Sequence, residues 1–569
     1  MMERRNSGRK PIRGTIRRTF RRCGWIHRYF DVLLVAGVLI LLGANEAELL
    51  RANNSFEAVR YPILRAVCFF LMVSAPLLLL PPRWNRFYSR TVVALVALSV
   101  LLQTFLVDQY GLAMEESLIT ILMVSSPGET GEYLGDLFFS RAMIDIVVAL
   151  ALFLLWWWLS PVLKFRPRRP EKIVGVLMLC PFAALSILFW VQNRPEEILN
   201  CATITRAGVA LHGYQTSLNA FVKAASEPEI PPDLHRKTGD LLGVIVIGES
   251  ATRTHHSLYG YGRRTNPELE KWRPELALFD DVIAPTVHTA SALINVFSFA
   301  TLQERNSPRC PFDTLARHAG FRTELLSNQL RWGEFDTPIT LMFKNVDQAR
   351  YLSEEEEAAP RDDRLVDVVS ERIRELPAGE PVILYVHLLG SHMPFRMRYP
   401  EEDARFPLPG ETFDPKIPEV TRQLTAEYDN SIRFTDRQVA RLLEQLKGLG
   451  RPSFLIYFSD HGEAFYPEAL EWVARDPNAN ESYEIPLFLW LSPEYRRERP
   501  ELFATARANQ QQPHQTDRLI YTLLDLAGIS WNGFPESESL LRSSYRPRPR
   551  FTHEGHQPYV PRSSREGFR

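Results

Sequence analysis

The chain has few cysteines for its length, five in 569 residues, and this scarcity limits which covalent and metal-binding frameworks it could use. Three of them, Cys23, Cys68 and Cys180, lie in a basic N-terminal arm or in apolar segments. The rest of the chain can therefore form at most one disulfide, between Cys201 and Cys310. The sequence leaves open whether these two thiols are bridged, because it does not fix the distance between their Cα atoms.

The chain also has almost no net charge, −1 overall, but its basic and acidic residues are unevenly distributed. The first 28 residues carry ten Arg or Lys against the single acidic Glu3. Such an arm could contact nucleic acid, but an apolar segment follows it directly. We therefore interpret residues 1–28 as a cytoplasmic anchor for a membrane span, and we expect no nucleic-acid partner.

Five apolar segments follow the arm, at about 29–48, 61–81, 91–107, 143–163 and 173–191. Each is near the roughly 20 residues that cross a bilayer as a helix. The first lacks the position and the small-residue site of a cleaved signal peptide. The loops 82–90 and 164–172 are basic, so counting positive charges puts the N-terminus in the cytoplasm and everything after Val191 outside. Residues 29–191 are thus predicted to form a five-helix membrane domain.

The remainder divides into three parts. Residues 192–240 read as a linker with some helix near the membrane surface, and residues 546–569 as a basic tail that we expect to be disordered or loosely docked. Between them, residues 241–545 alternate apolar β-rich runs with helical patterns and show no internal repeat. This alternation predicts an α/β domain with a mostly parallel sheet. The expected strands are 242–247, 322–326, 382–388, 453–458 and 486–491, and the long helical stretches are 420–448 and 515–527.

The run Leu242–Gly248 is apolar, rich in β-branched residues, and ends in Glu249. A run of this kind is typical of a central strand buried on both faces. Glu249 would then stand at the carboxyl end of the strand, where open α/β sheets bind ligands. An ordinary strand-to-helix turn with a capping carboxylate is the alternative.

A second predicted strand ends in Ser459-Asp460-His461. Asp460, His461 and Glu249 would supply two oxygen ligands and one nitrogen ligand, which suits a divalent ion such as zinc and leaves a position for a nucleophile. The alternative is a structural core histidine beside a capping aspartate.

The loop Ala284-Pro-Thr-Val-His-Thr289 offers hydroxyl groups near this edge, and Thr289 opens a predicted helix that runs to Phe299. Backbone N–H groups at a helix start favour phosphate, and metal coordination would lower the pKa of the hydroxyl. A plain helix N-cap is the alternative role for Thr289, and Thr286 and Ser291 are the fallback nucleophiles.

Several ordered motifs together resemble the bacterial phosphoethanolamine transferases that modify lipopolysaccharide on its core or lipid A, within the alkaline phosphatase and sulfatase superfamily. The resemblance covers most of the chain. It rests on motifs at family-like spacing: Gly248-Glu249-Ser250, Ser257–Leu269, Thr289 in Thr-Ala-Ser-Ala-Leu, Leu389-Gly-Ser-His392, Tyr428-Asp-Asn-Ser431 and Ser459-Asp-His-Gly-Glu463. It implies that Thr289 is the nucleophile and a zinc ligand together with Glu249, Asp460 and His461.

Other positions are assigned to substrate through the same resemblance. His392 would meet substrate or a second zinc and could protonate the leaving alkoxide. His387 is assigned to the substrate site, although its strand position favours a hydrogen-bonded structural role. Glu463 could bind a second metal or the ethanolamine ammonium, or be an exposed capping residue. Five further histidines match no family motif and are interpreted as surface or local hydrogen-bonding residues: His255, His256, His288, His553 and His556.

The sequence departs from the family at two places. At a second-metal or acceptor-binding position where relatives carry a histidine, this chain has Glu481, which leaves the number of zinc ions open. The carboxylate could still hold a metal or contact substrate, but it is a poorer proton donor near pH 7. The external loop with Ser125 and Glu129, which we call the donor loop, resembles the family's membrane-proximal threonine and glutamate that meet the lipid headgroup. Ser125 replaces the threonine, and Glu129 could pair with the ammonium of the donor or lie on a solvated helix face.

The resemblance implies a monomer in the bacterial inner membrane, with several spans and a periplasmic catalytic domain. It would transfer phosphoethanolamine from phosphatidylethanolamine to a lipopolysaccharide or another periplasmic glycan, through a covalent threonine intermediate. The alternatives are a phosphodiesterase or phosphoglycerol transferase of the same fold, and a non-catalytic membrane sensor or scaffold. A sulfatase activity is disfavoured because Cys310-Pro311-Phe312 lacks the Cys-x-Pro-x-Arg pattern.

Overall fold

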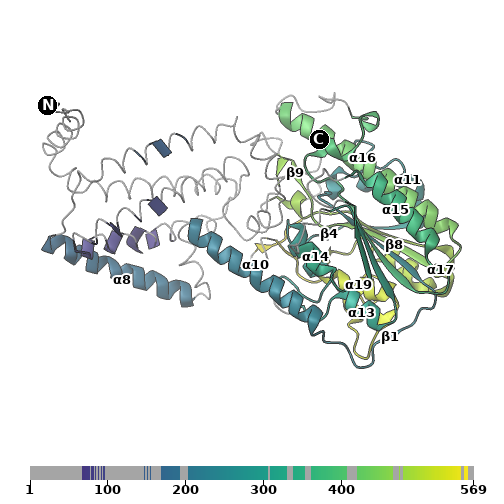
Figure 1. Ribbon diagram of the computed structural model, residues 1–569, viewed down its shortest axis with the longest axis horizontal. Coiled ribbons are helices and arrows are strands. Elements are labelled where there is room, and N and C mark those ends of the chain that lie inside the picture. Colours follow the sequence, from purple (N-terminus) through teal and green to yellow (C-terminus); the bar gives the residue numbers. More distant parts are fainter. Residues whose placement is uncertain are drawn as a thin grey trace, which may run out of the picture. The chain divides into compact units, whose positions relative to one another are not determined.

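The structure is a computed structural model of the whole chain (Figure 1). It describes scattered residues between 64 and 95 and between 147 and 154, and continuous stretches at 168–191, 203–304, 308–329, 338–352, 360–406, 419–465, 473–474, 479–552 and 557–561. The chain divides into two compact units, residues 1–119 with 129–214, and residues 120–128 with 215–569. Each unit is considered by itself.

The centre of the second unit is a seven-stranded sheet in the order β3-β11-β8-β2-β7-β5-β6. All five predicted strands are present with boundaries within two residues, and they form its interior. One strand, β11, runs in the opposite direction to the other six strands of this sheet. The mostly parallel sheet predicted from the sequence is therefore confirmed. The strands are β2 (Leu242–Gly248), β3 (Leu276–Phe279), β5 (Arg322–Ser327), β6 (Gln348–Tyr351), β7 (Val382–His387), β8 (Ser453–Ser459) and β11 (Leu487–Leu491).

Alternate residues of the central strand β2 enter two separate cores. Ile245 and Ile247 belong to one core, whereas Val244 and Val246 belong to the other, and all four are fully buried. A side chain of this type stabilises the fold by about 1.5–3 kcal/mol when it leaves water. Burial on both faces is the reason that the strand reads as a continuous apolar run.

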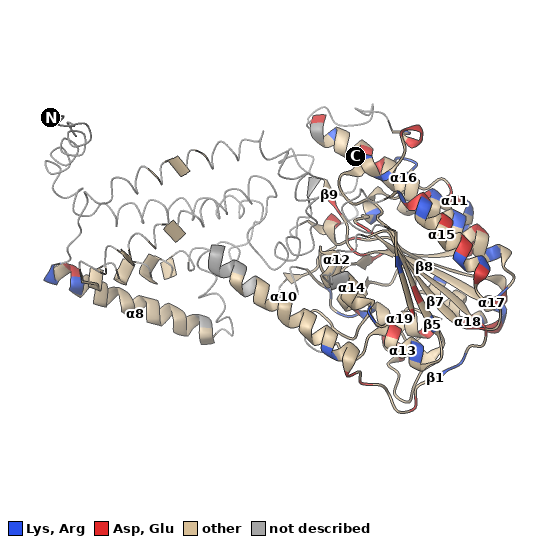
Figure 2. Cartoon of the chain, viewed as in Figure 1, with Lys and Arg blue, Asp and Glu red and all other residues tan. Residues whose placement is uncertain are grey.

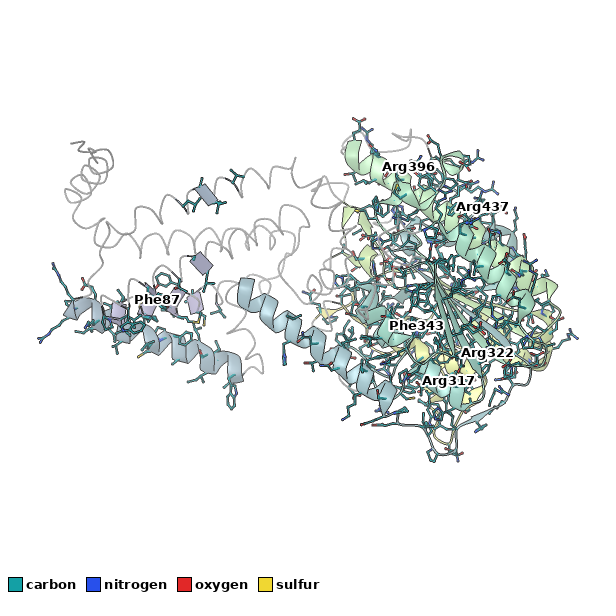
Figure 3. The ribbon with its side chains drawn as sticks, viewed as in Figure 1. Phe87, Arg317, Arg322, Phe343, Arg396 and Arg437 are labelled. Atoms are coloured by element: carbon teal, nitrogen blue, oxygen red, sulfur yellow. The ribbon has the colours of Figure 1, made fainter. Side chains whose placement is uncertain are left out.

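Helices cover both faces of the sheet (Figure 1). The core that contains Ile245 also holds residues of α12, α13, α18 and α19, and there Phe343 packs against Tyr385 of β7 with ring centroids 5.1 Å apart (Figure 3). The other core holds residues of α15 and α16. The α-helices of this unit are α11 (Leu269–Trp272), α12 (Thr289–Val296), α13 (Phe312–His318), α14 (Pro338–Met342), α15 (Asp362–Glu375), α16 (Glu419–Gly448), α17 (Pro493–Glu498), α18 (Pro500–Ala508) and α19 (Leu519–Leu526).

Short elements complete the domain around the sheet. The two-stranded pairs are β1 (His235–Arg236) with β13 (Ile529–Ser530), β4 (Val282–Ile283) with β12 (His514–Gln515), β9 (Ala464–Phe465) with β10 (Val473–Ala474), and β14 (Phe551–Thr552) with β15 (Gln557–Pro558). The 3-10 turns are η2 (Arg253–His255), η3 (Ser257–Tyr259), η4 (Arg273–Glu275), η5 (Phe395–Arg398), η6 (Glu401–Asp403), η7 (Asn480–Ser482), η8 (Thr516–Arg518) and η9 (Glu536–Glu538).

The described part of the first unit contains one helix that is long and apolar enough to cross a membrane, at Arg169–Leu188 within α8 (Arg169–Val191). It coincides with the fifth predicted span, and its charged residues are confined to its first turn (Figure 2). The segments 29–48, 91–107 and 143–163 lie wholly or mostly outside the described residues, and only short, interrupted helical stretches are described within 61–81. The five-span arrangement therefore stays a prediction. The predicted linker contains α10 (Thr203–Ser226).

The first part of the basic tail is docked, contrary to the expected disorder or loose attachment. Arg550 donates to both carboxylate oxygens of Asp281 at 2.7 and 2.9 Å, and Arg548 donates to Glu538 at 2.8 Å. The sequence pattern of alternating Arg and Pro resembles a solvated tail because the acidic partners lie far away in the chain. Residues 553–556 and 562–569, including His553 and His556, lie outside the described part.

Candidate metal centre

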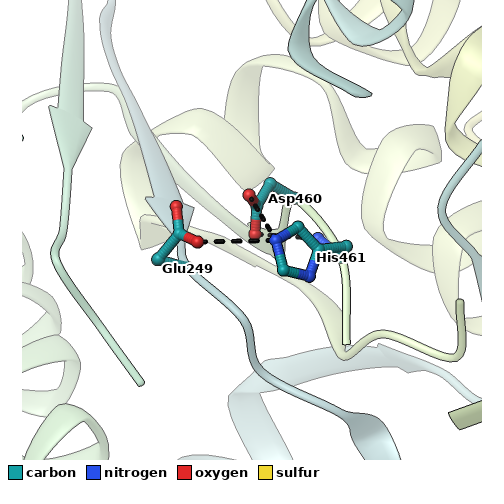
Figure 4. Close-up of side chains that lie close together, drawn as sticks. All are labelled: Glu249, Asp460 and His461. Carbon is teal, nitrogen blue, oxygen red and sulfur yellow. Dashed lines mark hydrogen bonds and ion pairs between the residues drawn. The ribbon is translucent and has the colours of Figure 1, made fainter. Parts of the chain in front are cut away.

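The two acidic residues and the histidine predicted to bind metal lie together at the carboxyl edge of the sheet (Figure 4). Glu249 follows β2, and Asp460 and His461 follow β8. Because β2 and β8 are parallel neighbours with Gly248 paired to Ser459, the next residues of both strands face the same space. The three side chains are buried, with 0–1% of each exposed.

The distances within this triad match those of a metal site. His461 Nε2 lies 3.5 Å from Glu249 Oε1 and 3.4 Å from Asp460 Oδ2. Two ligands of a tetrahedral zinc ion are separated by roughly 3.3 Å, because each bond is about 2.0–2.1 Å long. The ligand atoms of all three residues lie within 4.8 Å of one another. The arrangement therefore fits one ion without rearrangement of the backbone.

The protonation of the triad also suits a cation. His461 Nδ1 lies 2.9 Å from the carbonyl oxygen of Gly462, which can only accept, so Nδ1 carries a proton and the Nε2 lone pair of the neutral ring would be available to a cation between the carboxylates. Burial, together with the charge of Glu249, raises the pKa of Asp460 to about 6. Two buried carboxylates at this distance repel each other, and a divalent cation between them removes that cost.

Thr289 completes the constellation as the first residue of α12. Its hydroxyl donates to the Glu249 carboxylate, 3.3 Å from Oε1 and 3.2 Å from Oε2. The helix N-cap is His288, with extended backbone angles and no capping side chain, so the simple N-cap interpretation of Thr289 is not what the structure shows. The capping interpretation of Glu249 fails similarly, because η2 has Thr252 as its N-cap.

The fallback nucleophiles occupy other environments. The Thr286 hydroxyl donates to the carbonyl oxygen of His288 at 3.2 Å. Ser291 lies further along α12, where its carbonyl accepts a hydrogen bond from Asn295. Among the described residues of this loop, Thr289 alone has a recorded hydroxyl contact with the triad.

Several residues that sequence reasoning missed hold the triad in place. Ser250 donates its hydroxyl to Glu249 Oε1 at 2.9 Å and its backbone N–H to Asp460 Oδ1 at 3.0 Å. Gln329, just after β5, donates to Glu249 Oε2 at 3.3 Å. The Tyr428 hydroxyl donates to the Ser250 carbonyl and accepts from the Thr252 N–H, both at 2.7 Å. Ser250 and Tyr428 had given a signal only as members of motifs of the resemblance, and Gln329 had given none.

His387 and His392 flank a turn that packs against Glu249. Gly390 approaches so closely that an added Cβ would lie 2.8 Å from the backbone N and O of Glu249. His387 is fully buried at the end of β7, which lowers its pKa to about 4, so it is neutral. Neither of its ring nitrogens has a hydrogen-bond partner among the described residues, so the expected hydrogen-bonded role is not seen. His392 Nδ1 lies 2.7 Å from the Met393 carbonyl, which leaves Nε2 facing away from that bond.

Glu463 follows His461 by two residues, and Glu481 lies in η7. Glu463 is 2% exposed, which removes the exposed-cap interpretation. Glu481 belongs to η7, whose backbone contacts the residue after His461: Gly462 donates its N–H to the Ser482 carbonyl at 2.9 Å. Substrate-binding roles for both stay predictions. Ser125 and Glu129 lie outside the described residues.

Three of the histidines that match no family motif, His255, His256 and His288, are buried, at 3–6% exposure. Their interpretation as surface residues is therefore wrong. His255 does make the expected local contact, with Nδ1 lying 2.7 Å from Asp429 Oδ1. The same carboxylate group accepts from Tyr261 and Arg263 at 2.9 Å each. The sequence did not predict this cluster, because Asp429 lies in α16, 174 positions after His255 in the chain.

Replacing Gly462 by alanine should displace η7. A Cβ there would lie 2.1 Å from the carbonyl oxygen of Glu481, a backbone atom that cannot move away cheaply. We expect a loss of about 1–3 kcal/mol in the free energy of unfolding of the domain and weaker zinc binding, measured by denaturation and metal analysis. Gly262→Ala is the matched control, because its Cβ would meet nothing within 4 Å. Equal stability of the two variants would contradict the close contact.

Comparison with protein families matches residues 242–529 to the family described as Sulfatase. The chain is 27% identical over 462 residues to phosphoethanolamine transferase EptC of Escherichia coli K12, covering 77% of this chain and 79% of that protein. It is 25% identical over 496 residues to phosphoethanolamine transferase CptA of Salmonella typhimurium, covering 83% and 85%.

Solved structures show the same architecture. The zinc complex of the C-terminal periplasmic domain of E. coli EptC is 26% identical, with a TM-score of 0.54 over 58% of this chain and 96% of that chain. The integral membrane lipooligosaccharide phosphoethanolamine transferase EptA of Neisseria meningitidis covers 90% of this chain and 98% of its own, with a TM-score of 0.62. Its sequence identity is 17%, so this likeness concerns the fold.

Proposed function

Because the chain belongs to the sulfatase family and, within that superfamily, to the phosphoethanolamine transferases, we propose that it transfers phosphoethanolamine from phosphatidylethanolamine to a lipopolysaccharide or another periplasmic glycan. The observation that carries this proposal is the contact of the Thr289 hydroxyl with Glu249, inside a buried set of zinc-type ligands. A scaffold that had lost catalysis would have no need to keep this hydroxyl beside two buried carboxylates and a correctly oriented imidazole.

Glu249, Asp460 and His461 would hold a zinc ion, with the Thr289 oxygen as a further ligand. When bound, zinc supplies a Lewis acid that lowers the pKa of the hydroxyl and polarises the phosphate. The fully buried His387 stays neutral and adds no competing positive charge. The number of ions is not fixed by this set, because Glu481 occupies the position where relatives carry a histidine.

In the first half-reaction, the Thr289 hydroxyl gives up its proton to solvent, its Oγ attacks phosphorus, and the bond from phosphorus to the diacylglycerol oxygen breaks. The diacylglycerol alkoxide takes a proton, for which we assign His392 as donor. In the second half-reaction an acceptor oxygen attacks phosphorus, the bond to Thr289 breaks, and the released threonine oxygen takes up a proton from the acceptor hydroxyl or from solvent. Glu463 and Glu481 are the proposed contacts for the ethanolamine ammonium or for the acceptor.

Sulfatase chemistry at Cys310 has no support in the structure. Cys310 is fully buried in the core beneath the sheet, and burial raises the pKa of its thiol to about 12. A thiol in this state is inert as a nucleophile at neutral pH. Transfer through Thr289 is therefore favoured over chemistry that begins at Cys310.

We further propose that the protein is an inner-membrane enzyme with five spans and a periplasmic catalytic domain. The described span at Arg169–Leu188 supports this arrangement, as does the fold similarity to EptA over 90% of the chain. Comparing the lipopolysaccharide of a deletion strain with that of its parent tests the function. Loss of phosphoethanolamine from lipid A, core sugar or glucan names the acceptor, and an unchanged profile in all three contradicts the proposal.

The fragment from residue 240 onward should fold and bind zinc yet work poorly on donor lipid in bilayers. The membrane domain raises the effective concentration of the site at the headgroup plane, and this gain is lost in the fragment. We expect the activity of the fragment to fall by about 10²-fold or more on liposomes but to persist on a water-soluble, short-chain phosphatidylethanolamine.

Two variants of the full-length protein refine this experiment. Ser125→Ala and Glu129→Ala should weaken use of the natural donor without changing the zinc content, because both lie in the proposed donor loop. Equal activity of the fragment and the full-length protein on liposomes would show that the membrane domain is an anchor and that these two residues are not donor contacts.

A further inference from the structure

The C-terminal strap, which we define as residues 548–552 and 557–560, docks on the catalytic domain through specific pairs. Arg550 is held by Asp281 in a two-bond ion pair, and its guanidinium lies 4.7 Å from the ring centroid of Tyr559. Strands β14 and β15 pair antiparallel, which joins the two halves of the strap. Gln515 donates to the Phe551 carbonyl at 2.7 Å and accepts from its N–H at 3.0 Å.

Tyr559 is a partly buried strap residue that packs onto the domain. Its ring packs against a small buried cluster of Ile283, Val287 and Tyr483. Its hydroxyl donates to Glu484 Oε1 at 2.8 Å. The neighbouring Val560 contributes its carbonyl, which accepts from the Asn480 side chain at 3.0 Å.

The cluster under Tyr559 joins the loops that carry the reactive groups. Val287 lies two residues before the nucleophile Thr289. Tyr483 directly follows η7, and η7 contacts Gly462, the residue after His461. The Tyr483 carbonyl accepts a hydrogen bond from the Ala284 N–H at 2.7 Å. Tyr559 therefore packs on the nucleophile loop and on the loop behind a metal ligand at the same time.

Glu484 extends this connection to the segment after Glu249. It is 6% exposed, and its Oε2 pairs with the Arg253 guanidinium at 3.1 Å. Its carbonyl accepts from the Arg253 N–H at 2.9 Å. A single buried carboxylate thus holds both the strap and the chain that leaves the metal site.

We propose that the C-terminal strap positions the nucleophile loop over the metal centre, with Tyr559 as the positioning residue. The proposal rests on the proposed function of Thr289. Tyr559 has no recorded contact with Thr289 or the triad among the described residues, so its effect passes through Val287, Tyr483 and Glu484. Since displacements of about 1 Å can slow a reaction by roughly 100-fold, even modest loosening of this loop would matter.

Three variants of the full-length protein test this proposal. Tyr559→Ala removes the ring and the hydroxyl, and Tyr559→Phe removes the hydroxyl alone. Val560→Ala is the matched control, because its side chain is 72% exposed and only its backbone carbonyl makes the contact with Asn480. All three are measured for zinc content, for the single-turnover rate of protein phosphorylation by phosphatidylethanolamine, and for amide hydrogen exchange at Ala284.

We expect Tyr559→Ala to slow the covalent step by about ten- to 100-fold and Tyr559→Phe by about two- to tenfold. Zinc content should be unchanged in both, and the Ala284 amide should exchange faster in Tyr559→Ala than in Val560→Ala. If Tyr559→Ala does not fold, the rate and exchange of Tyr559→Phe decide the matter.

Two results would overturn the proposal. One is a normal covalent step and normal Ala284 exchange in the folded tyrosine variants. The other is a normal covalent step with a raised KM for the acceptor, which would make the strap part of the acceptor site. If the wild-type protein forms no covalent product, the function of Thr289 is wrong, and the exchange at Ala284 still decides whether the strap orders the loop.

Discussion

Thr289→Ala is expected to abolish transfer, with a fall in rate on the order of 10⁴- to 10⁶-fold, as when the nucleophile of a hydrolase is removed. The hydroxyl lies 3.2 Å from Glu249 Oε2, and no other described hydroxyl of the loop has a recorded contact with the triad. The variant should remain folded, because a partly exposed methyl and hydroxyl group at the start of a helix contribute only about 0.5 kcal/mol.

Ser291→Ala is the matched control for this experiment. It removes a hydroxyl from the same first turn of α12, two residues further on, and its activity should equal that of the wild type. Transfer assays with labelled phosphatidylethanolamine and thermal unfolding of both variants provide the measurements. Activity in Thr289→Ala together with inactivity in Ser291→Ala would move the nucleophile to Ser291.

Asp460→Asn is expected to lose zinc and, with it, nearly all activity. The substitution keeps the shape of the side chain but removes a charged ligand, and Oδ1 no longer accepts from the backbone N–H groups of Ser250 and His461 with the strength of a carboxylate. Removal of a ligand or of its support typically lowers metal affinity by at least about 10- to 100-fold. Chelation of the wild-type protein should have the same effect, and added zinc should reverse it.

The control for Asp460→Asn is Asp313→Asn. Asp313 is also buried, and burial raises its pKa to about 6, but it lies in α13 and is not part of the triad. The Asp313→Asn protein should have the same zinc content as the wild type, measured by metal analysis of the purified protein. Full activity of the wild-type enzyme after rigorous metal removal would show that the triad does not hold a catalytic ion.

The sequence predicted that Glu249, Asp460 and His461 lie together, because each follows a strand that is buried on both faces. Apolar runs marked β2 and β8, and parallel strands bring their carboxyl ends together, so Glu249 and Asp460 could be expected to meet. The strands β3 and β6 were missed. The first is a short apolar run, and the second is an edge strand whose residues Gln348–Arg350 are exposed, so neither has the pattern of a central strand.

Interactions between distant segments were beyond sequence reasoning. Gln329 meets Glu249 across 80 positions, and Tyr559 meets Glu484 across 75. No local pattern marks either pair, because each residue alone has the composition of an ordinary loop. The same holds for Arg548 and Arg550 of the tail. Their local sequence is typical of a solvated segment, but in the structure they pair with Glu538 and Asp281.

The central claim is that Thr289 carries phosphoethanolamine between donor and acceptor. The most direct measurement is mass spectrometry of the intact zinc-loaded protein after incubation with phosphatidylethanolamine and no acceptor, followed by fragmentation of the peptide that contains residue 289. We predict a mass increase of one phosphoethanolamine group, located on Thr289 and lost when acceptor is added. Transfer to acceptor by a protein that never carries the group, or that carries it on another residue, would contradict this account.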